Sequence, residues 1–385
     1  MASRLYRTTQ PLAARVTLVL DRLGISRVGS PTTAALIALY VSGLILLDER
    51  QTQTRVARFL PARAHDALNR LLRVMPLSTR ALMVLLREWV RRGGMDGYLC
   101  LDDVVVEKAF AKRLPWAGWT YSFAKKRKVY GLHVVVLLWC ARDGGGNFRV
   151  PVAFRLWRPK RSCSPRAYQT KLRLAEAMLK EVVGSGLRPR YVVFDTHYSA
   201  GWFTKLVGRL GLVWVGTLNP RTIVLRRGRR QSVAELAQER LPLKWRKRLG
   251  VRASAVNVYA PKYGSLRLVV TRNHHGNHEC IVTNELGADL TSVVERKRSR
   301  WSIETLFRDT KQYAGLEACQ CRVDQAMVRH VRLVLLTFVV LQMMRRSVED
   351  SLGSVKEHWQ LEVMRDGESP PPLLKASPPN LRATA

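Results

Sequence analysis

The stretch GYLCLDDVVVEK, residues 97–108, carries an apolar run into two adjacent aspartates, Asp102 and Asp103. A second apolar run, RPRYVVFDTHY at 188–198, leads into Asp195 in the same way. An aspartate at the end of a strand is often a turn residue or a helix cap, so each run alone favours a structural interpretation. The fold is decided by the order of the elements between the two runs.

Between and after these runs, the pattern predicts strands and helices in a definite order. Two strand-like runs, 129–140 and 148–157, are joined by the turn RDGGGN. A helical pattern follows at 167–183, and after the second aspartate run come a short helix at 201–211 and the strand LVWVGTL. This order predicts an α/β fold with a mixed sheet and flanking helices. Its first and fourth strands can lie side by side, which would bring the aspartates of the two runs together.

A third acid comes from RSRWSIETLFRDTKQYAGLE, residues 298–317. At about 100° per residue in an α-helix, Arg300, Glu304 and Lys311 share one narrow face. The neighbouring face is apolar and anchors the helix. Asp309 points roughly opposite Arg300, which predicts a surface position. An ordinary amphipathic helix with an Arg–Glu pair four residues apart would also explain this stretch.

The composition of the chain favours a polyanionic partner. Its 385 residues hold 65 Lys and Arg against 29 Asp and Glu, a formal net charge of +36. Such an excess destabilises a compact protein by self-repulsion, so nucleic acid is the expected partner. The basic runs KKRK (125–128), RRGRR (226–230) and KWRKR (244–248) are spread along the chain. An acidic membrane would favour a single basic block beside a span instead.

Other features of the chain predict a globular protein without membrane contact. The apolar runs 31–47 and 333–344 are short for membrane spans and are interpreted as buried helices. An early apolar stretch is interrupted by Asp21 and Arg22, so no signal peptide is expected. The six cysteines form no disulfide framework, which predicts reduced thiols. The histidines of HHGNHEC lack the spacing of a structural zinc site and are interpreted as a hairpin connection.

The three acid-bearing runs together resemble the signature blocks of bacterial insertion-sequence DDE transposases, in the broad IS4-like group and most like the IS701 family. LDDVVVEKAFAK resembles the first-aspartate block, YVVFDTHYSA the second, and RSRWSIETLFRDTKQ the glutamate block. Arg300, Glu304 and Lys311 fit the group's pattern of Tyr, Arg, Glu and Lys, and Lys297 stands in place of the Tyr. The resemblance covers roughly residues 98–320.

The resemblance implies a ribonuclease H-like fold and an enzyme that cuts and joins DNA. Asp102, Asp195 and Glu304 would be the catalytic residues and hold two Mg²⁺ ions, for which Mn²⁺ would substitute. Carboxylates suit such hard cations, and two ions can activate the attacking oxygen and stabilise the leaving one. Asp102 and Asp103 are adjacent on a strand and point to opposite faces. The family's usual pattern favours Asp102.

The expected DNA contacts are Arg300, Lys311, Lys297 and Arg308, because basic side chains beside the acids can hold phosphates. The implied partner is double-stranded DNA, both the terminal inverted repeats of the element and a target. A homodimer on paired ends is expected, in the bacterial cytoplasm and associated with the nucleoid.

The pattern divides the chain into five regions. They are a helical N-terminal DNA-binding domain (1–95), the first part of the catalytic core (96–217), a β-rich insertion (218–285), the glutamate helix and closing helix of the core (286–345), and a C-terminal extension with a disordered Pro/Ser-rich tail (346–385). The insertion resembles the one that contacts transposon-end DNA in this group. A larger sheet without such a role is the alternative.

Two other functions remain open. A nuclease of the same fold would share the acids but would not join a 3′ end to target DNA. A transposase-derived DNA-binding protein would lack catalysis, which requires the loss of an acid, and all three acids are present.

Overall fold

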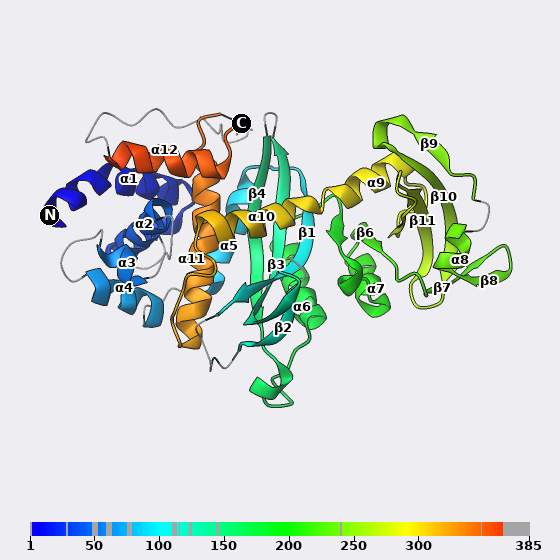
Figure 1. Ribbon diagram of the computed structural model, residues 1–385, viewed down its shortest axis with the longest axis horizontal. Coiled ribbons are helices and arrows are strands. Elements are labelled where there is room, and N and C mark those ends of the chain that lie inside the picture. The colour runs from blue at the N-terminus through cyan, green and yellow to red at the C-terminus, as the bar shows by residue number, and fades with distance from the viewer. Residues whose placement is uncertain are drawn as a thin grey trace.

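The computed structural model gives an elongated molecule with helices at one end and a β-rich part at the other (Figure 1). The residues that the structure describes are 2–27, 30–47, 53–58, 64–74, 79–109, 114, 116–122, 125–143, 146–238, 241–347 and 349–364. The Pro/Ser-rich tail predicted from about Asp366 lies outside these residues.

The N-terminal part of the chain is helical. It contains α1 (Ala2–Arg22), a 3₁₀ turn (Ile25–Arg27), α2 (Pro31–Leu46), α3 (Gln53–Arg58), α4 (Ala64–Arg73) and α5 (Thr79–Arg92). The hydroxyl of Ser30 caps α2 by accepting a hydrogen bond from the amide of Thr33 at 3.2 Å. Pro31 stands at the start of the helix, where its missing N–H is not needed. α2 packs against α1, α4 and α12 and is largely buried, so the run 31–47 is a core helix as predicted.

The first half of the sheet brings distant parts of the chain together. Its strands are β1 (Gly97–Glu107), β2 (Gly118–Ser122), β3 (Arg127–Asp143), β4 (Gly146–Trp157), β5 (Val192–Phe194) and β6 (Trp214–Thr217). β1 pairs antiparallel with β3 and parallel with β5, so the predicted neighbourhood of the first and fourth strands is confirmed. β1 does not end at its two aspartates, because its pairing with β3 continues to Glu107. Asp102 and Asp103 therefore lie within the strand.

The β-rich part continues the same sheet. It contains β7 (Ile223–Arg226), β8 (Arg229–Ser232), β9 (Lys244–Arg246), β10 (Val251–Ala260), β11 (Gly264–Arg272) and β12 (His278–Thr283). β12 pairs with β6, which gives a 12-stranded sheet in the order β2-β3-β1-β5-β6-β12-β11-β10-β7-β8, with β4 on β3 and β9 on β10. The HHGNHEC histidines lie at the β11–β12 connection, as expected.

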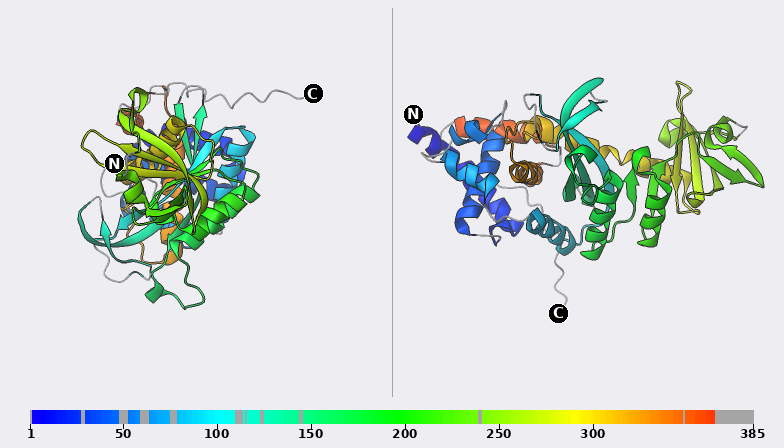
Figure 2. Two further views of the ribbon diagram at one scale, coloured as in Figure 1. Left: turned by 90° about the vertical axis from the view of Figure 1, so that its right-hand side faces the viewer. Right: turned by 90° about the horizontal axis from the view of Figure 1, so that it is seen from below.

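Helices cover both faces of the sheet. The remaining helices are α6 (Lys171–Gly184), α7 (Gly201–Arg209), α8 (Val233–Gln238), α9 (Leu290–Arg298), α10 (Trp301–Tyr313), α11 (Asp324–Met343) and α12 (Leu352–Met364), with 3₁₀ turns at Lys160–Ser162, Thr196–Tyr198 and Lys247–Leu249. α10 packs on β1, whereas α5 and α6 lie on the opposite side of the sheet (Figure 2). The result is a mixed α/β fold of the ribonuclease H-like kind.

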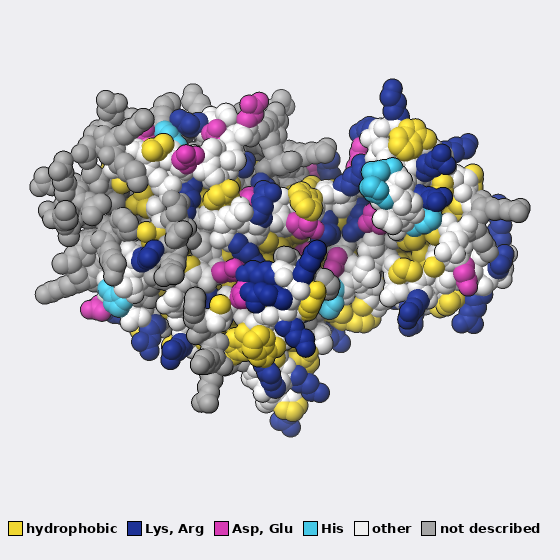
Figure 3. Space-filling view, viewed as in Figure 1, with side chains coloured by type: hydrophobic (Ala, Val, Ile, Leu, Met, Phe, Trp, Pro, Cys, Tyr) yellow, Lys and Arg dark blue, Asp and Glu magenta, His cyan; other side chains and the backbone are white. Residues whose placement is uncertain are grey.

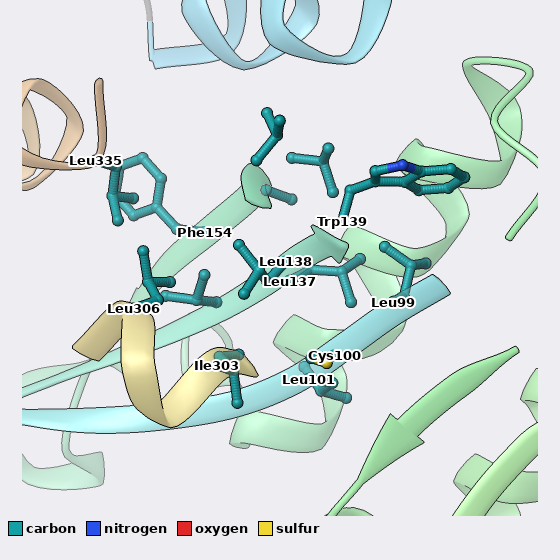
Figure 4. Packing of buried hydrophobic residues seen from close by; sticks show 14 of the residues in the cluster. Leu99, Cys100, Leu101, Leu137, Leu138, Trp139, Phe154, Ile303, Leu306 and Leu335 are labelled. Atoms are coloured by element: carbon teal, nitrogen blue, oxygen red, sulfur yellow. The ribbon is translucent and has the colours of Figure 1, made fainter. Parts of the chain in front are cut away.

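α11 closes the core between the sheet and the N-terminal helices. It is long and apolar enough to cross a membrane, but 89% of its most apolar window is buried within the protein. Its buried His330 forms a hydrogen bond through Nδ1 with the hydroxyl of Tyr40 on α2, at 2.9 Å. Ile303 and Leu306 of α10 enter the same apolar layer as Leu335 of α11 (Figure 4). The run 333–344 is thus part of a core helix, as predicted.

Candidate active site

One face of β1 points toward the start of α10. The hydroxyl of Tyr98 forms a hydrogen bond with that of Ser302 at 3.1 Å, and the thiol of Cys100 lies 3.7 Å from the carbonyl oxygen of Ser299. Since side chains alternate along a strand, Asp102 continues this face. The strand register therefore directs Asp102 toward the helix that carries the predicted glutamate.

Asp195 stands beside Asp102, directly after the neighbouring strand β5. Leu101 of β1 is in register with Phe194 of β5, and each aspartate is the next residue. Burial, and then the negative charge of Asp195, raise the pKa of Asp102 to about 7. The two carboxylates are thus close enough to repel one another.

The carboxylate of Asp195 is also fixed by its own turn. Its Oδ1 accepts hydrogen bonds from the backbone amides of His197 at 3.0 Å and Tyr198 at 3.3 Å. These bonds cap the short 3₁₀ turn Thr196–Tyr198. The capping role suggested by the sequence is therefore real, and it orients one carboxylate oxygen.

Glu304 joins the aspartates through Arg300. Glu304 lies in the first turn of α10, and Arg300 immediately precedes that helix. The guanidinium of Arg300 donates to Asp102 Oδ2 at 2.6 Å through Nη1 and to Glu304 Oε1 through Nη2. The structure thus brings the three predicted acids to one site and places a cation between two of them.

The site suits a divalent cation in its chemistry, although it is not a closed set of ligands. Among the described residues, no group of three His, Cys, Asp or Glu side chains is arranged to hold a metal ion. Arg300 stands between Asp102 and Glu304 in this arrangement. The pair of Asp102 and Asp195 fits Mg²⁺ or Mn²⁺, because both ligands are hard oxygens and a cation would offset the burial and the repulsion that together raise the pKa of Asp102.

Asp103 points to the opposite face of β1, toward α6. Its Oδ2 accepts from Lys171 Nζ at 2.6 Å and from His133 Nδ1 at 3.1 Å, and its Oδ1 accepts from the Tyr198 hydroxyl at 3.0 Å. Burial raises the pKa of Asp103, but the hydrogen bond from His133 and the charge of Lys171 outweigh it, and the pKa falls to about 2. Asp102, not Asp103, is on the face of Glu304.

Lys297 lies in the same electrostatic neighbourhood as the acids. Its side chain is only 11% exposed, and its Nζ is 4.0 Å from Glu279 Oε1. Burial and the charge of Arg300 lower the pKa of Lys297, while Glu279, Asp195 and Asp102 act in the opposite direction. Lys297 therefore adds positive charge next to the predicted site.

The two remaining predicted DNA contacts lie further along α10. Lys311 donates to the carbonyl oxygen of Val105 at 2.8 Å and pairs with Glu317 Oε1 at 2.9 Å. Arg308 is 56% exposed and forms an ion pair with Asp309 at 3.1 Å. Lys311 is thus held by protein groups, whereas Arg308 keeps an exposed side chain.

The predicted surface position of Asp309 is wrong. Asp309 is only 5% exposed. A helix packed only against the sheet would expose this side, but α10 also packs against α11 and α12. The angle around the helix is as expected, but the helical pattern does not show that α11 and α12 pack against this side of α10.

Three polar residues of this region were missed: His133, Lys171 and Tyr198, the partners of Asp103. They come from β3, the first turn of α6 and the turn after β5. Tyr198 is the only one with a local signal, because it lies three residues after Asp195 in the second aspartate run. The other two are isolated polar residues whose meaning depends on the tertiary fold.

Comparison with known proteins agrees with this geometry. A family model described as DDE superfamily endonuclease matches residues 26–273, more than half of the chain. The matched segment contains Asp102 and Asp195, and Glu304 follows it. A search of curated proteins found no match. The chain therefore belongs to the DDE superfamily of endonucleases.

Proposed function

We propose that this protein is an insertion-sequence transposase of the IS4-like group, most like the IS701 family, which cuts the ends of its own element and joins them to target DNA. The observation that carries the proposal is the convergence of Asp102, Asp195 and Glu304 from β1, the turn after β5, and α10. As a DDE endonuclease, the protein acts on DNA and uses divalent metal ions.

The three acids would have different roles in holding the metal ions. Asp102 and Asp195 would hold a first Mg²⁺, and Glu304 would contribute to a second once Arg300 releases it. Two bound ions would activate an attacking oxygen and stabilise the leaving oxygen of a phosphodiester. The same pair of sites would serve both cleavage and joining, with Mn²⁺ as a substitute for Mg²⁺.

Arg300 has a second role in this proposal. In the protein alone its guanidinium is neutralised by Asp102 and Glu304. A DNA phosphate offers the same bidentate pairing, so DNA and metal together can replace these contacts. Lys297 and Arg308 would hold neighbouring phosphates. Lys311 would have to leave Glu317 to do so.

A basic and aromatic surface beside the site supports DNA as the partner. On β2, Trp119 is 70% exposed and Tyr121 is 49% exposed, and the side chains of 125–128 (KKRK) are exposed at the start of β3. Lys and Arg side chains gather over the middle of this face, with hydrophobic side chains below them (Figure 3). Cations for phosphates and aromatic rings for bases are the usual elements of a DNA-binding surface.

The other parts of the proposal follow from the family resemblance and the charge. The N-terminal helices would recognise the terminal inverted repeats, and the β-rich part from β7 to β12 would contact end DNA through its basic runs. Two copies on paired ends would act together, in the bacterial cytoplasm with the nucleoid.

The test is a Mg²⁺-dependent cleavage and strand-transfer assay on duplexes that contain the DNA flanking this gene. Wild type is compared with Glu304→Gln and with the matched control Glu357→Gln, which changes an exposed glutamate on α12. We expect Glu304→Gln to lose cleavage and joining by at least about 10³-fold. DNA binding by gel shift should stay within about threefold, and the control should behave as wild type.

The outcomes separate the alternatives. Cleavage without joining of a 3′ end would favour a nuclease of the same fold. DNA binding without any reaction in Mg²⁺ or Mn²⁺ would favour a transposase-derived binding protein. An active Glu304→Gln enzyme would exclude the assigned site.

A further inference from the structure

A second polar cluster lies on the face of β1 opposite to the candidate active site. It consists of Asp103, His133, Lys171 and Tyr198, and we name it the Asp103 cluster. Asp103 is the next residue after Asp102, so the strand directs the two carboxylates to opposite faces of the sheet. The Asp103 cluster therefore lies one residue away from the predicted metal ligands and does not share their face.

Tyr198 belongs to both sites. Its hydroxyl donates to Asp103 Oδ1 at 3.0 Å, and its backbone amide donates to Asp195 Oδ1 at 3.3 Å. The Tyr198 ring is fully buried and contacts the ring of Phe203. A single residue thus ties the turn that orients Asp195 to the strand that carries Asp102.

The cluster itself is well anchored. Lys171 comes from the first turn of α6 and His133 from β3, and both donate to Asp103 Oδ2. The ring of Trp157 packs edge-on against His133 at 5.3 Å and lies under the ammonium group of Lys171 at 5.8 Å. Asp103 is therefore held from three elements besides its own strand.

We propose that Asp103 is a positioning residue, which through Tyr198 fixes the carboxylate of Asp195 at the distance from Asp102 that a shared divalent cation requires. Asp103 is not itself a ligand, because its two oxygens already accept three hydrogen bonds and a cation would have to displace Lys171. The role of Asp103 in metal binding rests on the proposed function. The hydrogen bond that links Asp103 to the turn through Tyr198 does not depend on that function.

The physical need for such a tie is the repulsion between the two aspartates. Two carboxylates side by side repel one another, and this repulsion favours movement of the short turn Thr196–Tyr198, and with it Asp195, away from Asp102. A hydrogen bond from a buried hydroxyl to a buried carboxylate opposes this movement. Partners that hold metal ligands in place typically change metal affinity by about 10–100-fold when they are removed.

The first experiment uses metal-free protein and hydrogen exchange measured by mass spectrometry. Tyr198→Phe removes only the hydroxyl that reaches Asp103. We expect the amides of His197 and Tyr198 to exchange at least about tenfold faster, because opening of the turn becomes easier. The matched control is Tyr130→Phe, which removes a hydroxyl that is hydrogen-bonded to the backbone of Leu114. This variant should leave the exchange rates of the His197 and Tyr198 amides unchanged.

The second experiment measures Mn²⁺ binding by calorimetry. Tyr198→Phe and Asp103→Asn should each weaken Mn²⁺ about 10–100-fold, while Asp102→Asn should remove binding at the shared site. Thermal melting of each variant reports whether the fold is intact. Since Tyr198→Phe loses one hydroxyl, it tests the proposal even if Asp103→Asn does not fold.

Each outcome decides a different point. Unchanged hydrogen exchange of the His197 and Tyr198 amides in Tyr198→Phe would contradict the link between Asp103 and the turn. Faster exchange with unchanged Mn²⁺ affinity would overturn its role in positioning. Loss of Mn²⁺ in Asp103→Asn as complete as in Asp102→Asn, with normal affinity in Tyr198→Phe, would make Asp103 a ligand and overturn the proposal. Mn²⁺ binding that survives Asp102→Asn would instead contradict the proposed function.

Discussion

At the scale of single residues, the ionisation of Asp102 links the site to the stability of the protein. Burial and the charge of Asp195 raise its pKa from 3.8 to about 7. Between these values the folded protein binds more protons than the unfolded chain, so the free energy of unfolding falls as pH rises from about 4 to 7. Above pH 7 the destabilisation is complete. An ionised Asp102 is thus costly until a cation binds.

Asp102→Asn should remove this pH dependence. In EDTA we expect the variant to be more stable than wild type at pH 8, by at most about 4 kcal/mol, because each unit of pKa corresponds to about 1.4 kcal/mol. At about pH 3 the two should be nearly equal, since Asp102 is then mostly protonated in both the folded and the unfolded wild-type protein. Urea unfolding at both pH values measures the difference. The same stability difference at both pH values would show that Asp102 does not titrate in this range.

Asp309 leads to a second prediction, which differs from the one its angle on the helix suggests. Its carboxylate is buried and paired with Arg308. Asp309→Ala should lower the free energy of unfolding by about 1–3 kcal/mol, because a buried side chain and its ion pair with Arg308 are lost. Urea denaturation measures this, with Glu357→Ala on the exposed side of α12 as the control. Equal stability of Asp309→Ala and the control would contradict the buried position.

At the scale of elements, the contact between α7 and the β10–β11 turn is very close. Gly201 begins α7, and a Cβ at this position would overlap the backbone carbonyl of Lys262. Gly201→Ala should therefore destabilise the protein by about 1–3 kcal/mol, because backbone atoms cannot move aside easily. Gly184→Ala is the matched control, since its Cβ would meet nothing within 4 Å. It should be neutral or stabilising by up to about 1 kcal/mol. Equal melting temperatures for the two variants would contradict this close packing.

Sequence patterns predicted most elements of the catalytic part but not their pairing over long distances. The alternation of apolar residues located β1, β3, β4 and β5, and the helical periodicity located α10. β2 was missed because its five residues contain no apolar run. The pairing of β6 with β12 was missed because a strand pattern does not identify a partner that lies more than 60 residues away.

The candidate site was predictable to the extent that its residues lie in local runs. Asp102, Asp195 and Glu304 each belong to a run with a recognisable pattern. The bridge from Arg300 to Asp102 was not predictable, because it joins residues 198 positions apart. The partners of Asp103 were missed for the same reason, and the burial of Asp309 depends on helices that pack from later in the chain.

At the scale of the whole molecule, the net charge of +36 predicts a protein that is stabilised by salt. Raising KCl from about 50 to about 300 mM should raise the melting temperature, because the Debye length shortens and self-repulsion is screened. At low salt, a short DNA duplex should raise it further through binding, and this gain should shrink as salt rises. A melting temperature that falls with salt would contradict the view that repulsion dominates the electrostatics.

The ion pairs of Arg300 with Asp102 and Glu304 can form only after the ribosome has added residues 300–304 to the chain. Asp195 is synthesised roughly 5–20 s before Arg300, and Asp102 roughly 10–40 s before it, at about 5–20 residues per second. α2 and α4 of the N-terminal region likewise gain part of their packing only when α11 has emerged. A growing chain therefore carries two of the three proposed metal ligands before it carries the third, and we predict that a product that stops before residue 298 does not cut DNA.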